Sequence, residues 1–96
     1  PDPAVAKDPR EVLCIGRSSD PNKGVRTLIE ALAKVPPEIR LTLVDDDSPD
    51  NKVRRWAREA GCLDRIALTG RVDSTELLRL YRRAALVVVP SRYEGF

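Results

Sequence analysis

The sequence predicts an α/β protein built on a parallel, Rossmann-like sheet, and three observations support this fold class. The short apolar segments are continuous instead of alternating with polar residues, which is typical of strands buried on both faces. Segments with apolar residues at the helical period separate them. Strand and helix alternate along the chain, which gives four strands and three helices. The expected strands cover residues 11–15, 41–44, 66–69 and 86–89.

The chain is expected to start with a linker before it enters the sheet. Residues 1–10 contain three prolines and two aspartates, a composition typical of an extended linker. The folded domain is expected over residues 11–96, with its first strand ending at Gly16. Pro36 and Pro37 end the first helix, because proline lacks the amide hydrogen that a helix needs. The expected buried face of this helix consists of Val25, Leu28, Ile29, Leu32 and Ala33.

The second and third helices carry start and end signals. Asp50 is the expected N-cap of the second helix, and Gly61 is its expected left-handed C-cap. Asp73, followed by Glu76, has the form of a capping box that opens the third helix. The expected buried faces are Val53, Trp56, Ala57 and Ala60 in the second helix, and Leu77, Leu78, Leu80, Tyr81 and Ala84 in the third.

The order of the strands predicts where a ligand binds. Right-handed crossovers give the order 3-2-1-4, with a switch point between the first and fourth strands. Ligands of such sheets bind outside the carboxyl ends of the strands at that point. The segments to consider for a site are therefore residues 16–24, 70–73 and 91–96.

Composition limits the classes of function. The 96 residues are 42% hydrophobic and 33% charged, which suits one small globular domain, and the net charge of +2 predicts no nucleic-acid partner. No apolar run is long enough for a membrane span, and no signal peptide is recognisable. The chain begins at Pro1 without Met, so we expect that it is cut from something longer or has lost its start. Cys14 and Cys62 fit no disulfide framework or zinc site, so we expect reduced thiols in the cytoplasm.

Residues 16–24 have the chemistry of a diphosphate site. Arg17 and Lys23 place two cations on a loop that leads into a helix N-terminus, and Gly16 and Gly24 allow close approach of backbone to a ligand. A guanidinium binds phosphate oxygens through two parallel hydrogen bonds, and an ammonium adds a point charge. The alternative is that both cations are solvated and the glycines only shape turns. The spacing matches neither the P-loop nor the dinucleotide-binding glycine motif.

A carboxylate follows the expected fourth strand. Glu94 comes after a Pro-Ser turn, at the same predicted sheet edge as Arg17 and Lys23. Its oxygens can accept hydrogen bonds from sugar hydroxyls. The alternative is a surface glutamate that contacts only water.

Five motifs together resemble the carboxy-terminal domain of the family 4 glycosyltransferases, in matching order across residues 11–96. They are Gly16-Arg17 with Lys23-Gly24, residues 41–44, Leu68-Thr69-Gly70-Arg71-Val72, residues 81–87, and Pro90-Ser91-x-x-Glu94-Gly95-Phe96. The resemblance implies the GT-B architecture, with Arg17 and Lys23 on the donor's diphosphate and the loop of Gly70, Arg71 and Val72 beside the nucleotide base. It also implies that Glu94, the first carboxylate of the family's Glu-x7-Glu motif, is a catalytic residue at the transferred sugar.

The activity implied by this resemblance is transfer of a sugar from a nucleotide-diphosphate donor to an acceptor hydroxyl, with retained anomeric configuration. No metal and no permanently bound cofactor are expected. The acceptor, a glycan, a lipid or a small molecule, is expected to bind a domain that the sequence lacks. The second glutamate of the motif, which holds the ribose, is missing as well. We therefore expect a truncated donor-binding domain that is inactive alone, from a cytoplasmic parent enzyme that is either free or peripheral at a membrane.

Two departures from the family pattern and two rival interpretations remain. Asp45-Asp46-Asp47-Ser48-Pro49 stands where the family has Gly-Asp-Gly-Pro, and Ala84-Ala85 stands where it has Ala-Asp.

The aspartates also resemble the magnesium-binding strand end of a phosphoacceptor receiver domain, although a receiver carries them after its first strand. The other interpretation is a piece without catalysis that binds nucleotide or self-associates through a bare strand edge at residues 86–89.

Overall fold

The computed structural model describes residues 7–15 and 24–88 of the chain. Strands and helices alternate as the sequence predicts. The strands are β1 (Asp8–Ile15), β2 (Arg40–Val44), β3 (Ile66–Leu68) and β4 (Ala84–Val88). The helices are α1 (Gly24–Leu32), α2 (Lys52–Ala60), the short 3-10 helix η1 (Leu63–Arg65) and α3 (Ser74–Arg83).

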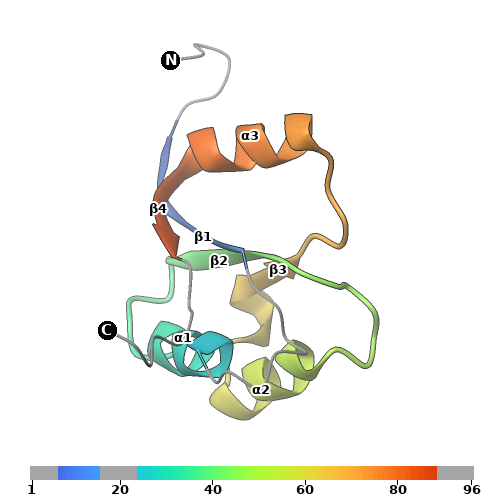
Figure 1. The fold of residues 1–96 in the computed structure, drawn as a ribbon. Coiled ribbons are helices and arrows are strands. Elements are labelled where there is room, and N and C mark those ends of the chain that lie inside the picture. The colour runs from blue at the N-terminus through green and yellow to red at the C-terminus, as the bar shows by residue number, and fades with distance from the viewer. Residues whose placement is uncertain (1–6, 16–23, 89–96) are drawn as a thin grey trace, which may run out of the picture.

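The four strands form one parallel sheet in the order β3-β2-β1-β4, which confirms the predicted topology. Cys14 on the central strand β1 is in register with Leu43 of β2 and with Val88 of β4. Figure 1 shows α1 and α2 together on one face of the sheet and α3 on the other. The carboxyl ends of the strands therefore meet at one edge, where a ligand site is expected.

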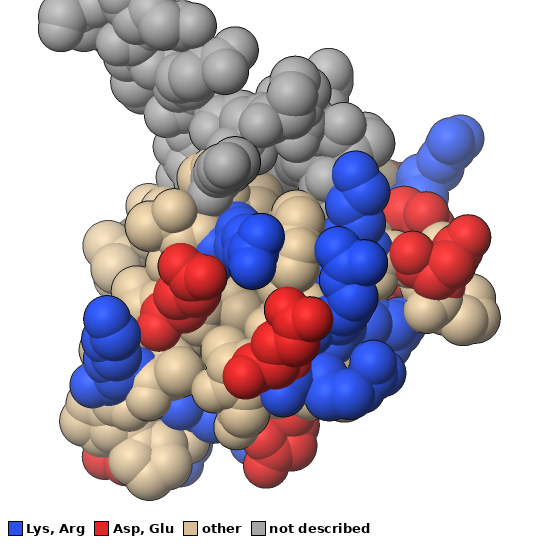
Figure 2. Space-filling view, turned by 90° about the horizontal axis from the view of Figure 1, so that it is seen from below, with Lys and Arg blue, Asp and Glu red and all other residues tan. Residues whose placement is uncertain are grey.

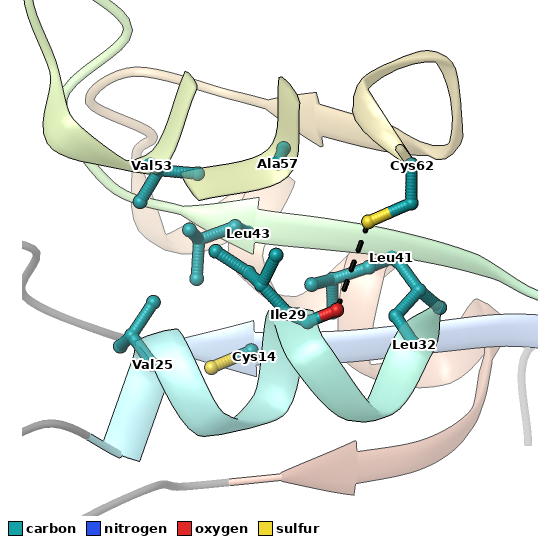
Figure 3. Close-up of a cluster of buried hydrophobic side chains, with 9 residues drawn as sticks. All are labelled: Cys14, Val25, Ile29, Leu32, Leu41, Leu43, Val53, Ala57 and Cys62. Atoms are coloured by element: carbon teal, nitrogen blue, oxygen red, sulfur yellow. Dashed lines mark hydrogen bonds between the residues drawn. The ribbon is translucent and has the colours of Figure 1, made fainter. Parts of the chain in front are cut away.

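The main core lies between the sheet and the α1–α2 pair (Figure 3). Its buried side chains are Cys14, Val25, Ile29, Leu32, Leu41, Leu43, Val53, Ala57 and Cys62. The Cys62 thiol donates a weak hydrogen bond to the Ile29 carbonyl oxygen, at 3.6 Å. Burial raises the pKa of the Cys14 thiol to about 12 and also raises the pKa of Cys62. Both cysteines are free thiols that act as small apolar core residues.

The core on the α3 face is smaller, and it differs from the prediction. Leu13, Leu80 and Ala84 are buried there, whereas Leu78 and Tyr81 are 48% and 40% exposed. α3 packs on β1 and β4. The main contacts of α3 are with these two strands, so it buries a narrow stripe, and the broad apolar face expected from the sequence is wrong at Leu78 and Tyr81. Ala84 is the first residue of β4 and not a helical residue.

Two element boundaries differ from those predicted. β1 begins at Asp8, within the segment expected to be a linker, because Asp8 already pairs with Ala84 of β4. The Asp8 carboxylate also accepts hydrogen bonds from the backbone N–H and the Nε–H of Arg10, at 3.0 and 3.2 Å. α3 ends at Arg83 and β4 follows without a loop, so β4 starts two residues earlier than expected.

The helix caps confirm two predictions and correct a third. Gly61 is the left-handed C-cap of α2, with φ of 78°, and Asp73 is the N-cap of α3, accepting from the Glu76 N–H at 2.8 Å. Asn51, not Asp50, caps α2, because the Asn51 side chain accepts from the Val53 N–H at 2.9 Å. The Asn51 amide also donates to the Asp46 carbonyl oxygen, which fixes Asn51 as the capping residue.

Charged side chains of both signs share the face that α1 and α2 cover (Figure 2). Arg26 and Glu30 of α1 form one such pair, with Nε and Oε2 3.6 Å apart, and Arg26 also lies 5.9 Å from the centre of the Trp56 ring. Exposed pairs of this kind contribute little stability. In the part of the chain that the structure describes, no helix has the length and apolar character needed to cross a bilayer.

Candidate functional site

A pocket opens at the carboxyl ends of β1, β2 and β3, on the predicted edge of the sheet. It lies on the β2 and β3 side of β1, whereas the predicted switch point lies between β1 and β4. Its volume is about 580 Å³. Apolar side chains from the strand ends and from α3 lie beside a set of charged and backbone groups. The lining residues are Ile15, Val44, Asp45, Asp46, Asp47, Gly70, Arg71, Val72 and Leu77. This combination of apolar surface and a few polar groups is typical of small-molecule sites.

The loop after β3 forms one wall of the pocket, and backbone hydrogen bonds hold it to the end of β2. The Thr69 N–H donates to the Leu43 carbonyl oxygen at 3.1 Å, and the Gly70 N–H donates to the Asp45 carbonyl oxygen at 2.9 Å. Gly70 has φ of +72°, which favours glycine. A Cβ atom at this position would also lie 3.0 Å from the Asp47 carboxylate. Only glycine therefore fits the loop without displacing its neighbour.

The acidic turn after β2 forms the neighbouring part of the wall, and its own hydrogen bonds give it a defined shape. Ser48 donates its backbone N–H and its hydroxyl to the two carboxylate oxygens of Asp46, at 3.1 and 2.7 Å. Asp45 accepts the Asp46 N–H at 2.7 Å. Arg54 of α2 donates to the carbonyl oxygens of Ser48 and Asp47, at 3.1 and 2.7 Å. The departure from the family's glycine-rich pattern thus gives an ordered turn.

The hydrogen bonds from Ser48 also lower the pKa of one carboxyl group of this turn, that of Asp46. The bond from the Ser48 hydroxyl, followed by that from its backbone N–H, lowers the pKa of Asp46 below the usual range. Asp46 is therefore a carboxylate at neutral pH, with both oxygens occupied by Ser48. Among the residues that the structure describes, no group of three acidic, histidine or cysteine side chains is placed to hold a metal ion.

The structure describes part of the predicted site. Gly70, Arg71 and Val72 line the pocket. Gly24 is the first residue of α1. The other predicted site residues lie outside the described residues, and they are Gly16, Arg17, Lys23 and Glu94.

Sequence reasoning missed the turn after β2 as a pocket wall. For residues 45–47 the sequence predicts a change in turn shape or magnesium binding, and it does not predict their contact with Gly70. The predicted strand order implies this wall, because β2 lies between β1 and β3 and the loops after all three parallel strands meet at one edge. The contact between Asp47 and Gly70 follows from this adjacency.

Comparison with known proteins gives the family. A family described as "Glycosyl transferases group 1" matches residues 1–96, the whole chain. The chain belongs to the group 1 glycosyltransferases. This membership overturns the receiver-domain interpretation of residues 45–47, and the structure agrees, because these aspartates follow β2 and not the first strand.

Several curated proteins are similar to this glycosyltransferase chain. A glycogen synthase from Mycobacterium tuberculosis is 35% identical, over 98% of this chain and 24% of that protein. A mannosylfructose-phosphate synthase from Agrobacterium fabrum is 36% identical, over 88% of this chain and 21% of that protein. A D-inositol 3-phosphate glycosyltransferase from Mycobacterium sp. (strain KMS) is 37% identical, over 97% of this chain and 22% of that protein. The chain spans about a quarter of the length of these relatives.

Proposed function

We propose that this chain supplies part of the donor site of a retaining, family 4 glycosyltransferase of GT-B architecture. The enzyme would transfer a sugar from a nucleotide-diphosphate donor to an acceptor hydroxyl. The observation that carries the proposal is the pocket at the carboxyl ends of β1, β2 and β3, lined by Gly70, Arg71 and Val72, in a chain of this family. The names of the relatives, which include a glycogen synthase and an inositol phosphate glycosyltransferase, support sugar transfer to hydroxyl-bearing acceptors.

Two cations give the proposed site its catalytic power. Arg17 and Lys23 fall between β1 and α1 in the sequence, and α1 begins at Gly24, so the positive end of its dipole follows Lys23 directly. Negative charge grows on the diphosphate as it leaves the sugar. Cations that bind this charge stabilise the transition state more than the ground state, as catalysis requires. In this proposal no metal ion is needed.

The remaining roles complete the reaction. Glu94 is the proposed catalytic residue at the transferred sugar, where its carboxylate accepts hydrogen bonds from the sugar hydroxyls. The loop of Gly70, Arg71 and Val72 lies beside the nucleotide base. The acceptor, a glycan, a lipid or a small molecule, binds residues outside this chain. The proposed setting is the cytoplasm, with the enzyme free or peripheral at a membrane.

Calorimetric titration of the chain with UDP-glucose, GDP-mannose and ADP-glucose tests the donor site. We expect at least one of them to bind in the presence of EDTA, and the double variant Arg17→Ala, Lys23→Ala to lose this binding. A matched double variant, Lys34→Ala and Arg58→Ala, removes the same charge from exposed positions outside the pocket and should bind as the unaltered chain does. Binding that survives the first double variant, or no binding of any donor, would contradict the proposal.

Retention of the anomeric configuration is tested separately, on an enzyme preparation that contains this chain and transfers sugar. The anomeric proton coupling of the first-formed product, read by proton NMR, should match that of the donor. An inverted product would contradict this part of the proposal and leave the donor site untouched.

A further inference from the structure

The three aspartates of the pocket differ in what their carboxylates contact. Both oxygens of Asp46 are occupied by Ser48, and Asp45 accepts the Asp46 N–H. Among the described residues, the Asp47 carboxylate has no hydrogen-bond or ion-pair partner. It lies flat against Gly70, with Oδ1 and Oδ2 at 3.2 and 3.0 Å from the position of a Cβ atom there. Asp47 is thus a carboxylate with open acceptor sites on the wall of the pocket.

The contact between Asp47 and Gly70 places Asp47 next to the proposed base site. In the donor site proposed above, the loop of Gly70, Arg71 and Val72 lies beside the nucleotide base. The Asp47 carboxylate lies against Gly70 of this loop and lines the same pocket. A base beside the loop would therefore be within reach of the Asp47 carboxylate.

The chemistry of a free carboxylate distinguishes the bases. The Watson–Crick edge of guanine presents two adjacent donors, N1–H and the N2 amino group, which match the two oxygens of one carboxylate. Adenine presents one donor beside an acceptor, and uracil presents one donor between two acceptors, so each would set a lone pair against the carboxylate. Building on the donor site proposed above, we propose that Asp47 selects guanine and that the donor is a GDP-sugar.

The charge of the pocket provides a second way to test this assignment. The pocket is lined by three aspartates and one arginine, Arg71, so its described charge opposes an anionic ligand. Removing the charge of Asp47 should therefore strengthen the binding of any nucleoside diphosphate that gains nothing from the carboxylate. GDP, which donates two hydrogen bonds to the carboxylate, should lose the most affinity. The ratio of affinities, and not the affinity for one ligand, reports the role of Asp47.

The experiment is calorimetric titration of the chain with GDP, inosine diphosphate, ADP and UDP. Inosine diphosphate keeps N1–H and lacks the N2 amino group. The unaltered chain should bind GDP about tenfold more tightly than ADP or UDP, with inosine diphosphate in between. Asp47→Asn should bring all four affinities to within about twofold of one another, because the amide offers one acceptor instead of two. Asp50→Asn makes the same charge change outside the pocket and should keep the preference.

Each result decides the question. Equal binding of all four nucleotides by the unaltered chain overturns the assignment of guanine and leaves the donor site standing. A guanine preference that survives Asp47→Asn assigns the selection to another group. An equal loss for all four in Asp47→Asn means that the carboxylate holds the ribose, which every ligand shares, and also overturns the inference. Failure of every nucleotide to bind overturns both this inference and the proposed function.

Discussion

Thr42 donates its hydroxyl hydrogen to the Glu11 carboxylate across the β1–β2 pair, and both side chains are buried. Thr42→Val keeps the shape and removes the donor, so a buried carboxylate loses a hydrogen bond. The free energy of unfolding, measured by urea denaturation, should fall by about 1.5–3 kcal/mol. Thr27→Val, on the exposed face of α1, should change it by less than about 0.5 kcal/mol.

A second variant separates the hydrogen bond from side-chain packing. Glu11→Leu in the Thr42→Val background removes both polar partners, and it should recover part of the lost stability because no buried carboxylate remains. Arg83, which lies 3.9 Å from the Glu11 carboxylate, has a 46% exposed side chain that can turn to water. A double variant that is less stable than Thr42→Val would contradict this account of the pair.

The N-cap of α2 gives the second prediction. Asn51→Ala removes the acceptor for the Val53 N–H and should lower the free energy of unfolding by about 1 kcal/mol. Asp50→Ala, one residue earlier and exposed, should leave it nearly unchanged. Urea denaturation of the two variants is a direct comparison of the predicted cap with the observed one. A larger loss for Asp50→Ala would restore the assignment made from the sequence.

These caps illustrate how far the sequence determines the fold. Gly61 and Asp73 are predicted correctly because each signal is local, a left-handed glycine or an acceptor three residues before an N–H group. Asp50 and Asn51 are equally good caps by residue type. The choice between them depends on the bond from Asn51 to the Asp46 carbonyl oxygen, which exists only once the turn after β2 is formed.

The same limit applies to burial and to the site. Five apolar residues of the segment 77–84 are too many for one helical face, because Leu78 and Leu80 are two residues apart and point to opposite sides of α3. The packing of α3 on β1 and β4 buries Leu80 and leaves Leu78 exposed. The loop at Gly70 is predictable from its position after a strand. Its contact with Asp47 depends on β2 and β3 being neighbours in the sheet, and the sequence of either loop alone does not show this.

The ionisation of Asp46 gives a prediction for pH. Its pKa lies below the usual 3.8 because Ser48 donates to the carboxylate. A lowered folded-state pKa stabilises the native state above the unfolded pKa, and this contribution is lost as the pH falls through the folded pKa. Ser48→Ala removes the hydroxyl bond and should raise the pKa of Asp46 toward 3.8, as read by carboxyl carbon NMR titration. Ser74→Ala on α3 should leave it unchanged; an identical titration in both variants would contradict the assignment.

The edge of the sheet leads to a prediction about assembly. In the described sheet β4 pairs only with β1, and Leu86 is 56% exposed. An apolar edge strand invites pairing with another chain, so we expect self-association to increase with concentration in sedimentation velocity. Leu86→Lys should shift the chain toward monomer, whereas Leu78→Lys, at an exposed position of α3, should not. A monomer at high concentration would count against this edge as a contact surface.

Two left-handed glycines provide the last prediction, because they share a conformation and differ in their neighbours. A Cβ atom at Gly61 would meet nothing within 4 Å, whereas one at Gly70 would press on the Asp47 carboxylate. Gly61→Ala and Gly70→Ala should each lower the free energy of unfolding by about 1–2 kcal/mol through backbone strain. Only Gly70→Ala should also weaken nucleotide binding, since the displaced carboxylate and loop form two walls of the pocket. If both variants bind nucleotide equally well, the loop after β3 does not contact the ligand, and the pocket at this sheet edge is not the donor site.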